Sequence, residues 1–212
     1  VEDAAGATAG QDFLLSISES LEIVAPSLAE WTVGASLDPA VYFLHGGTGS
    51  VSFSSASGLP AGIEFSEGGK LSGAPSEHGT FNIRIEATDE IGATATHESV
   101  WVINDAPAFD AEDYADWTVG EPYDQQIGST GGTAPLKCEL VDGSLPVGLA
   151  FDFESGAAKI SGTPTEVGSY DFDIRITDAN GAEAVLSASI AVNPRPAIAT
   201  INLPDWSANH TF

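Results

Sequence analysis

The sequence predicts an all-β protein built from two tandem β-sandwiches, each with about seven short strands. Three observations lead to this prediction. Landmark residues recur along the chain, apolar and polar residues alternate within short segments, and glycine- and proline-containing turns separate those segments. The 212 residues are 42% hydrophobic and include 23 glycines and 12 prolines. A chain of this length and composition can bury two separate cores.

An internal repeat is the strongest of these signals. Residues 30–34 read Glu-Trp-Thr-Val-Gly, residues 116–120 read Asp-Trp-Thr-Val-Gly, and an Asp-Trp pair recurs at 205–206. Further matches keep the same phase: Gly-Gly at 46–47 and 131–132, Leu-Pro-x-Gly at 59–62 and 145–148, Ser-Gly-x-Pro at 72–75 and 161–164, and Thr-Asp at 88–89 and 177–178. So many landmarks in register indicate repeated domains rather than chance similarity.

The register of the repeat divides the chain into four parts. We expect the last strand of a preceding repeat at 1–18, complete repeats at 19–104 and 105–193, and the first strand of a following repeat at 194–212. Two whole repeats between two fragments predict a longer array, or terminal strands that are exchanged between subunits.

Alternation inside each repeat predicts which residues face a core. Tyr170, Phe172, Ile174 and Ile176 alternate with charged residues, so we expect these four side chains to point inward. The last strand of the second repeat places Ala188, Ile190 and Val192 on one face. In the first repeat, residues 100–103 leave the inward face ambiguous. Each repeat has about 88 residues, and short strands separated by so many turns within that length are typical of a seven-stranded sandwich.

The segments Leu-Pro-Val-Gly-Leu-Ala-Phe at 145–151, Ile-Ser-Gly-Thr-Pro at 160–164 and Ile-Thr-Asp-Ala-Asn-Gly-Ala at 176–182 resemble an immunoglobulin-like repeat family. That family is akin to the cadherin-like domain of dystroglycan, and its members occur in tandem in bacterial surface proteins, adhesins, secreted polysaccharide enzymes and phage tails. The resemblance implies immunoglobulin/cadherin-like sandwiches that serve as spacers or binding modules.

Charge limits the classes of partner. The chain carries 31 acidic and 6 basic residues, for a formal net charge of -25. Nucleic acids and anionic membranes both require clusters of Lys and Arg, so we expect neither as a partner. No apolar run approaches the roughly 20 residues of a membrane span. An acidic surface suits an extracellular position on a cell, virion or appendage, where salt and divalent cations screen it.

The linker between the two repeats is the candidate metal site. Residues 103–110 resemble a cadherin linker, which binds calcium between domains, because Asn-Asp precedes Pro-x-Phe. In a seven-stranded antiparallel sandwich, the turn between the sixth and seventh strands lies beside the incoming linker, and it carries Asp178 and Asn180. We therefore predict calcium ligands at these positions: Asn104, Asp105, Asp110, Asp178 and Asn180.

The other linkers do not repeat this pattern. Residues 193–196 read Asn-Pro-Arg-Pro, and the segment before the first repeat, 18–20, reads Ser-Glu-Ser. Calcium would therefore not be uniform along the array, and prolines would stiffen the second joint instead. A hydrated acidic linker without any cation is the alternative.

No catalytic machinery is apparent. His45, His78, His97 and His210 have no metal-ligand spacing, and no nucleophile elbow, phosphate loop or zinc motif is present. The single cysteine, Cys138, alternates with leucines and is expected to be a small buried hydrophobe. We therefore predict a non-enzymatic structural or adhesive spacer whose partners are neighbouring repeats or subunits. The alternative is a glycan-binding module, on its own or accessory to a secreted polysaccharide-degrading enzyme, with Trp31 and Trp117 as stacking platforms.

Overall fold

The computed structural model of the chain describes residues 4–8, 10–12, 14–28, 30–110, 114–154 and 156–198. They form two compact units. Unit 1 is built on the chain up to residue 106 together with 131–134 and 179–182, and unit 2 on the remainder. All regular elements in the described residues are β-strands, so the predicted all-β class is confirmed. None of these residues forms a helix that could span a membrane.

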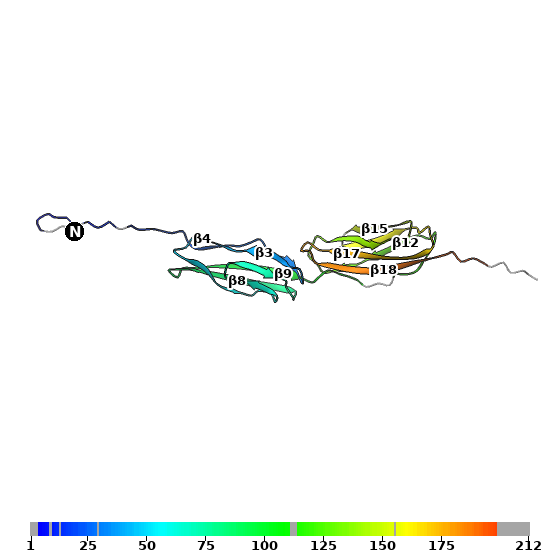
Figure 1. Ribbon diagram of the computed structural model, residues 1–212, viewed down its shortest axis with the longest axis horizontal. Coiled ribbons are helices and arrows are strands. Elements are labelled where there is room, and N and C mark those ends of the chain that lie inside the picture. The colour runs from blue at the N-terminus through cyan, green and yellow to red at the C-terminus, as the bar shows by residue number, and fades with distance from the viewer. Residues whose placement is uncertain are drawn as a thin grey trace, which may run out of the picture. The chain divides into compact units, whose positions relative to one another are not determined.

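Unit 1 contains nine strands. They are β1 (Glu22–Val24), β2 (Glu30–Thr32), β3 (Leu37–Val41), β4 (Phe43–His45), β5 (Val51–Ser57), β6 (Ile63–Phe65), β7 (Lys70–Gly73), β8 (Gly79–Asp89) and β9 (Thr94–Asn104). One sheet has the order β2-β9-β8-β5, a second has the order β3-β7-β6, and β1 pairs with β4. Figure 1 shows β3 in the layer facing β8 and β9.

Unit 2 repeats this topology strand for strand. Its strands are β10 (Ala108–Phe109), β11 (Trp117–Thr118), β12 (Tyr123–Ile127), β13 (Ser129–Thr130), β14 (Lys137–Gly143), β15 (Leu149–Glu154), β16 (Ala157–Gly162), β17 (Gly168–Thr177) and β18 (Glu183–Asn193). The sheets are β11-β18-β17-β14 and β12-β16-β15, with β10 paired to β13. In Figure 1, β12 and β15 form one layer and β17 and β18 the other.

Over the described residues, the predicted count of about seven strands corresponds to nine shorter ones in each unit, because the first two strands are each divided, the second into β3 and β4 or into β12 and β13. The first strand divides between the sheets: β1 pairs antiparallel with β4, whereas β2 pairs parallel with β9. The same division occurs in unit 2, where β11 pairs parallel with β18. A strand that changes sheets must break its hydrogen-bond ladder, which explains the short segments.

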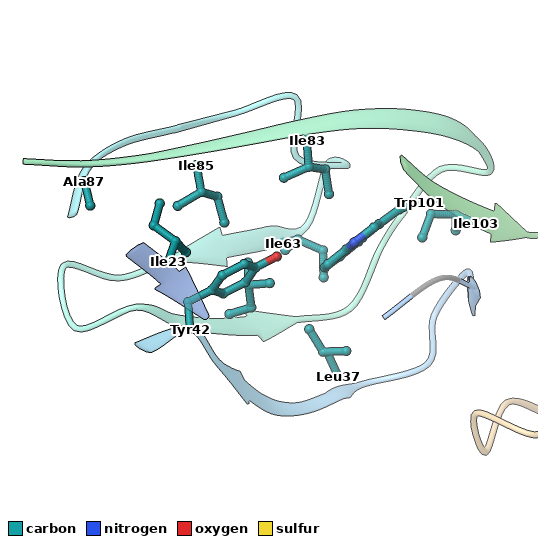
Figure 2. Packing of buried hydrophobic residues seen from close by; sticks show 10 residues of the cluster. Ile23, Leu37, Tyr42, Ile63, Ile83, Ile85, Ala87, Trp101 and Ile103 are labelled. Carbon is teal, nitrogen blue, oxygen red and sulfur yellow. The ribbon is translucent and has the colours of Figure 1, made fainter. Parts of the chain in front are cut away.

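The inward faces follow the alternation where it is clear. Phe172, Ile174 and Ile176 are at most 2% exposed, and Ile190 and Val192 are buried with them. The ambiguous face of β9 is decided by Trp101 and Ile103, which are both 3% exposed. Figure 2 shows the Trp101 indole and the Tyr42 ring pointing into the space between the sheets of unit 1. The side chains of Trp101 and Ile103 fill more of that space than Val100 and Val102 would, so β9 presents them inward.

Paired glycines explain the recurring Leu-Pro-x-Gly and Ser-Gly-x-Pro motifs. In unit 1, Gly62 and Gly73 both have positive φ, at 88° and 113°. A Cβ on Gly62 would collide with the carbonyl oxygen of Ala74, and one on Gly73 with the carbonyl oxygen of Gly62. The two turns contact each other through the amide of Ala74, which donates to Gly62 O at 3.2 Å. Only glycine permits this approach.

Gly148 and Gly162 form the same pair in unit 2, with Thr163 N donating to Gly148 O at 3.1 Å. The expected terminal strands are described only in part: Thr8 is an isolated bridge residue, and residues 199–212 lie outside the described residues.

Candidate functional site

The loops that follow β4 and β8 in unit 1 are held together by a buried carboxylate. Asp89 is 7% exposed. Its Oδ2 accepts a hydrogen bond from the Thr48 amide at 2.9 Å, and its Oδ1 accepts from the Ile91 and Ala93 amides at 3.1 and 2.7 Å. These donors, the Thr48 amide first, lower the pKa of the Asp89 carboxyl below its usual value. Asp89 is thus a structural anchor that joins two loops.

Asp178 occupies the matching position in the second repeat, and it is 6% exposed. The loops around it share part of the same pattern: the Ala179 amide donates to Thr133 O at 2.9 Å, as the Glu90 amide donates to Thr48 O at 3.2 Å. Sequence reasoning assigned Asp178 to a metal and overlooked Asp89. The signal for a structural aspartate was the Thr-Asp pair, which occurs in both repeats. The Asn-Asp pair of the linker is not repeated in this way, so the recurring aspartate indicates a role inside each domain rather than at the linker.

A buried polar network occupies the end of unit 1 at which β2 and β9 finish. Thr32 is completely buried, and its hydroxyl oxygen lies 2.7 Å from that of Thr133. The amide of Asn104 donates to Thr133 Oγ1 at 3.0 Å, and the amide of Asn180 donates to Thr32 Oγ1 at 3.1 Å. The Thr133 hydroxyl also lies 3.2 Å from Trp31 O. The partly buried asparagines thus satisfy the two buried hydroxyls, as buried polar groups require.

The predicted calcium ligands are divided between the units. Asn104, Asp105 and Asn180 belong to unit 1, and Asp110 and Asp178 belong to unit 2. Asn104 and Asn180 take part in the hydroxyl network, and Asp105 Oδ1 lies 2.9 Å from Nδ1 of His78. Within the described residues, no three His, Cys, Asp or Glu side chains are grouped so that they could hold a metal ion. Calcium at this linker stays a prediction.

The tryptophans take part in the sandwiches. Trp31 packs partly buried against the core of unit 1, and its Nε1 donates to Ala35 O at 3.0 Å. Trp117 does the same in unit 2, with Nε1 donating to Glu121 O at 3.0 Å and the ring edge-on to Tyr123 at 5.2 Å. Both indoles thus have their polar edge bonded to a backbone carbonyl and part of their surface packed against a core.

In the part of the chain that the structure describes, the other histidines and the cysteine lie apart from one another, each with its own contacts. His45 lies 3.5 Å from Glu19, and the His97 ring packs edge-on to Tyr42 at 5.8 Å. His210 lies outside the described residues. Cys138 is half-buried against the core of unit 2, and burial raises the pKa of its thiol to about 11. The expectation of a small hydrophobe therefore agrees with its packing, although the side chain is only partly covered.

Comparison with known proteins identifies the repeats. The sequence profile of the family "Putative Ig domain" (He_PIG) matches residues 5–104 and 106–193. The chain belongs to this family. The two matches cover the two sandwiches, and the paired glycines and the buried aspartates Asp89 and Asp178 are features that these He_PIG domains share within the chain.

One relative is the serine-rich adhesin for platelets of Staphylococcus aureus (strain N315), which is 30% identical over 161 residues. The match covers 70% of this chain but only 7% of the adhesin, so the chain spans a small fraction of the curated relatives it matches. Among solved structures, eight immunoglobulin domains of the Down syndrome cell adhesion molecule align over 82% of this chain and 27% of that one. Their TM-score is 0.57 at 14% identity.

The titin fragment I67–I69 aligns over 85% of this chain and 67% of that one, with a TM-score of 0.53 at 12% identity. At such low identities, these two structures show the immunoglobulin-like fold alone.

Proposed function

We propose that the two He_PIG domains are non-catalytic spacers that bear mechanical load within a large extracellular surface, filament or appendage protein. The observation that carries this proposal is the parallel pairing of the first and last strands in each domain. Thr32 is paired with Asn104 at the end of β9, and Thr118 with Asn193 at the end of β18. Backbone bonds from Val33 N to Asn104 O and from Val119 N to Asn193 O, both 2.9 Å, continue these pairs.

The parallel arrangement matters because of the direction in which force acts. When the first and last strands run parallel, a pull on the two ends of a domain slides one strand past the other. All the hydrogen bonds between them then resist together, whereas an antiparallel hairpin pulled from its open end loses them one at a time. Each domain has this arrangement. A spacer in a surface protein needs this property, since it must stay folded while it transmits force.

The polar and aromatic residues that are candidates for binding or catalysis make contacts within the domains, and this also supports a spacer. Asp89 anchors loops, Asn104 and Asn180 bind buried hydroxyls, and the indoles of Trp31 and Trp117 are bonded to backbone carbonyls. Similarity to a bacterial adhesin agrees with an extracellular position. We further propose that the partners along the array are neighbouring repeats, and that the net charge of -25 keeps nucleic acid away.

Single-molecule force spectroscopy tests the proposal. The chain is pulled from its two ends, and the variants Val33→Pro and Val119→Pro each remove one amide from a parallel pair. We expect both to lower the unfolding force of the domain concerned by a larger fraction than they lower its equilibrium stability. Equal fractional losses would show that these pairs have no special mechanical role. Saturable binding to a glycan array, abolished by Trp31→Ala or Trp117→Ala, would favour the glycan-binding alternative.

A further inference from the structure

A groove runs along one side of unit 1, between the outer strands of its two sheets. β5 is the last strand of the four-stranded sheet, and β6 is the last strand of the three-stranded sheet. Phe53, Leu59 and Phe65 give the groove its apolar lining, and the cavity has a volume of about 230 Å³. The polar part of the lining comes from the serines of β5 and from Ser66 and Glu67, which follow β6. The rings of Phe53 and Phe65 are edge-on at 5.2 Å, and both contact the core of the unit.

The backbone beside this groove is an open sheet edge. In the described part of the chain, β5 pairs with β8 and with no other strand. The outward N–H and C=O groups of such a strand form a template to which another extended chain can add. Its sequence, Val-Ser-Phe-Ser-Ser-Ala-Ser, contains no charged residue and no proline. Proteins block an edge with charged side chains, prolines or bulges. β5 has no charge and no proline, and its one irregularity, a register shift between Phe53 and Ser55, has a counterpart in β14 between Leu140 and Asp142.

Unit 2 provides an internal comparison. β14 is its equivalent edge strand, and it carries Lys137, Glu139 and Asp142. Glu139 is held across the sheet by Arg175, which donates to its carboxylate. Cys138 occupies the position that corresponds to Phe53, since each pairs with the residue two places before the buried Asp of its unit. The edge of β14 is thus blocked by charge and lacks the aromatic residue, whereas the edge of β5 has the aromatic residue and no charge.

The charge of the molecule indicates the occupant. Glu67 lines the groove and Glu64 lies exposed on β6, in a chain whose net charge is -25. A second copy of the chain would bring the same negative charge and be repelled, but a basic segment would be attracted. We propose that β5 and its groove bind an extended, cationic polypeptide segment, which adds to unit 1 as an extra strand and places one apolar side chain against Phe53 and Phe65. Peptide recognition by strand addition combines these two elements. This binding goes beyond the spacer function and does not depend on it.

A synthetic peptide provides the test. The probe is fluorescein-labelled Lys-Val-Lys-Val-Lys-Val-Lys with blocked ends, titrated into the isotopically labelled chain. We expect saturable binding, with backbone shifts and slowed hydrogen exchange confined to β5 and its neighbours. A second peptide, N-methylated at every peptide nitrogen, has the same charge but has no backbone N–H left to donate along either edge. Its affinity should be lower by at least about tenfold, because several backbone hydrogen bonds are lost.

Two variants localise the site. Ser54→Lys puts a charge on the exposed edge of β5 within the groove lining, and Ser144→Lys makes the same change of charge at an exposed position of unit 2. We expect the first to abolish binding and the second to leave it within about twofold, as screened charges at a distance do. Equal affinity of the N-methylated peptide, shifts spread over both units, equal effects of the two variants, or no binding would each overturn the proposal. Self-association through β5, relieved by Ser54→Lys, would identify a second copy as the occupant and likewise overturn it.

Discussion

The hydroxyl oxygens of Thr32 and Thr133 lie 2.7 Å apart within unit 1, although 101 positions separate these residues in the sequence. Thr32 ends β2, the short strand that pairs parallel with β9. The amides of Asn104 and Asn180 donate to these two hydroxyls. Two asparagines selected as metal ligands from the sequence thus donate to Thr32, which belongs to the recurring Trp-Thr-Val-Gly segment, and to Thr133, which follows the second Gly-Gly pair.

Removing the Thr133 hydroxyl should destabilise unit 1. Thr133→Val keeps the side-chain shape but removes the hydroxyl that is hydrogen-bonded to the Thr32 hydroxyl and that accepts from the Asn104 amide. We expect a loss of about 1–3 kcal/mol in the free energy of unfolding, because buried polar groups lose their hydrogen bonds. Urea denaturation measures this loss. Thr130→Val, at an exposed position of β13, is the matched control and should be nearly neutral. Similar losses for both variants would contradict a stabilising network.

Asp89 should make unit 1 sensitive to acid. Its pKa is lowered in the folded state by backbone donors, of which the Thr48 amide has the largest effect. A carboxyl whose folded pKa lies below its unfolded pKa adds stability above the unfolded value, and that stability is lost as the pH falls through the folded value. We expect the melting temperature to fall on acidification and Asp89→Asn to show a lower, flatter profile. Parallel profiles for the two proteins would exclude Asp89 as the cause.

The paired glycines should tolerate no side chain. Gly73→Ala combines a positive φ of 113° with a collision against the carbonyl of Gly62. Gly92→Ala is the matched control, since Gly92 has a φ of 85° but no atom within 4 Å of the added carbon. We expect a loss of about 1–2 kcal/mol for the control, from backbone conformation alone, and a distinctly larger one for Gly73→Ala. Chemical denaturation compares them, and equal losses would show that the collision is relieved at no cost.

Cys138 should be unreactive while unit 2 is folded. With a pKa of about 11, only about a thousandth of the thiol is ionised at pH 8. The thiolate is the reactive form, so its alkylation should be slower than that of the unfolded chain by about two orders of magnitude. Reaction with iodoacetamide at pH 8, with and without denaturant, measures the ratio. Comparable rates in the two conditions would mean that the folded thiol is ionised and accessible.

Calcium at the linker is tested by thermal unfolding in EDTA and in millimolar calcium. If Asn104, Asp105, Asp110, Asp178 and Asn180 bind the ion, the midpoint should rise with calcium, since a ligand of the folded state stabilises it. Asp105→Ala should abolish the rise, with Asp124→Ala, which removes an exposed carboxylate of β12, as the control. A midpoint that is unchanged by calcium, or that responds equally to magnesium and sodium, would rule out the cadherin-like site.

The sequence by itself determined the class, the repeat and most of the core. Alternation identified Phe172, Ile174 and Ile176 as buried, because every second residue of a strand faces one side. Turn motifs marked the ends of the strands, because positions such as Gly62 and Gly73 admit only glycine. These are local constraints, and a local pattern is enough to express them.

Only the tertiary structure decided the parts that depend on contacts between distant segments. The face that β9 presents to the core was settled by the fit of Trp101 against the other sheet, and the parallel pairing of β2 with β9 by a strand that changes sheets. The partners of Asn180, and the open edge of β5 beside Phe65, likewise join segments far apart in the chain. Such contacts depend on packing and on the satisfaction of buried polar groups, and neither has a fixed spacing in the sequence.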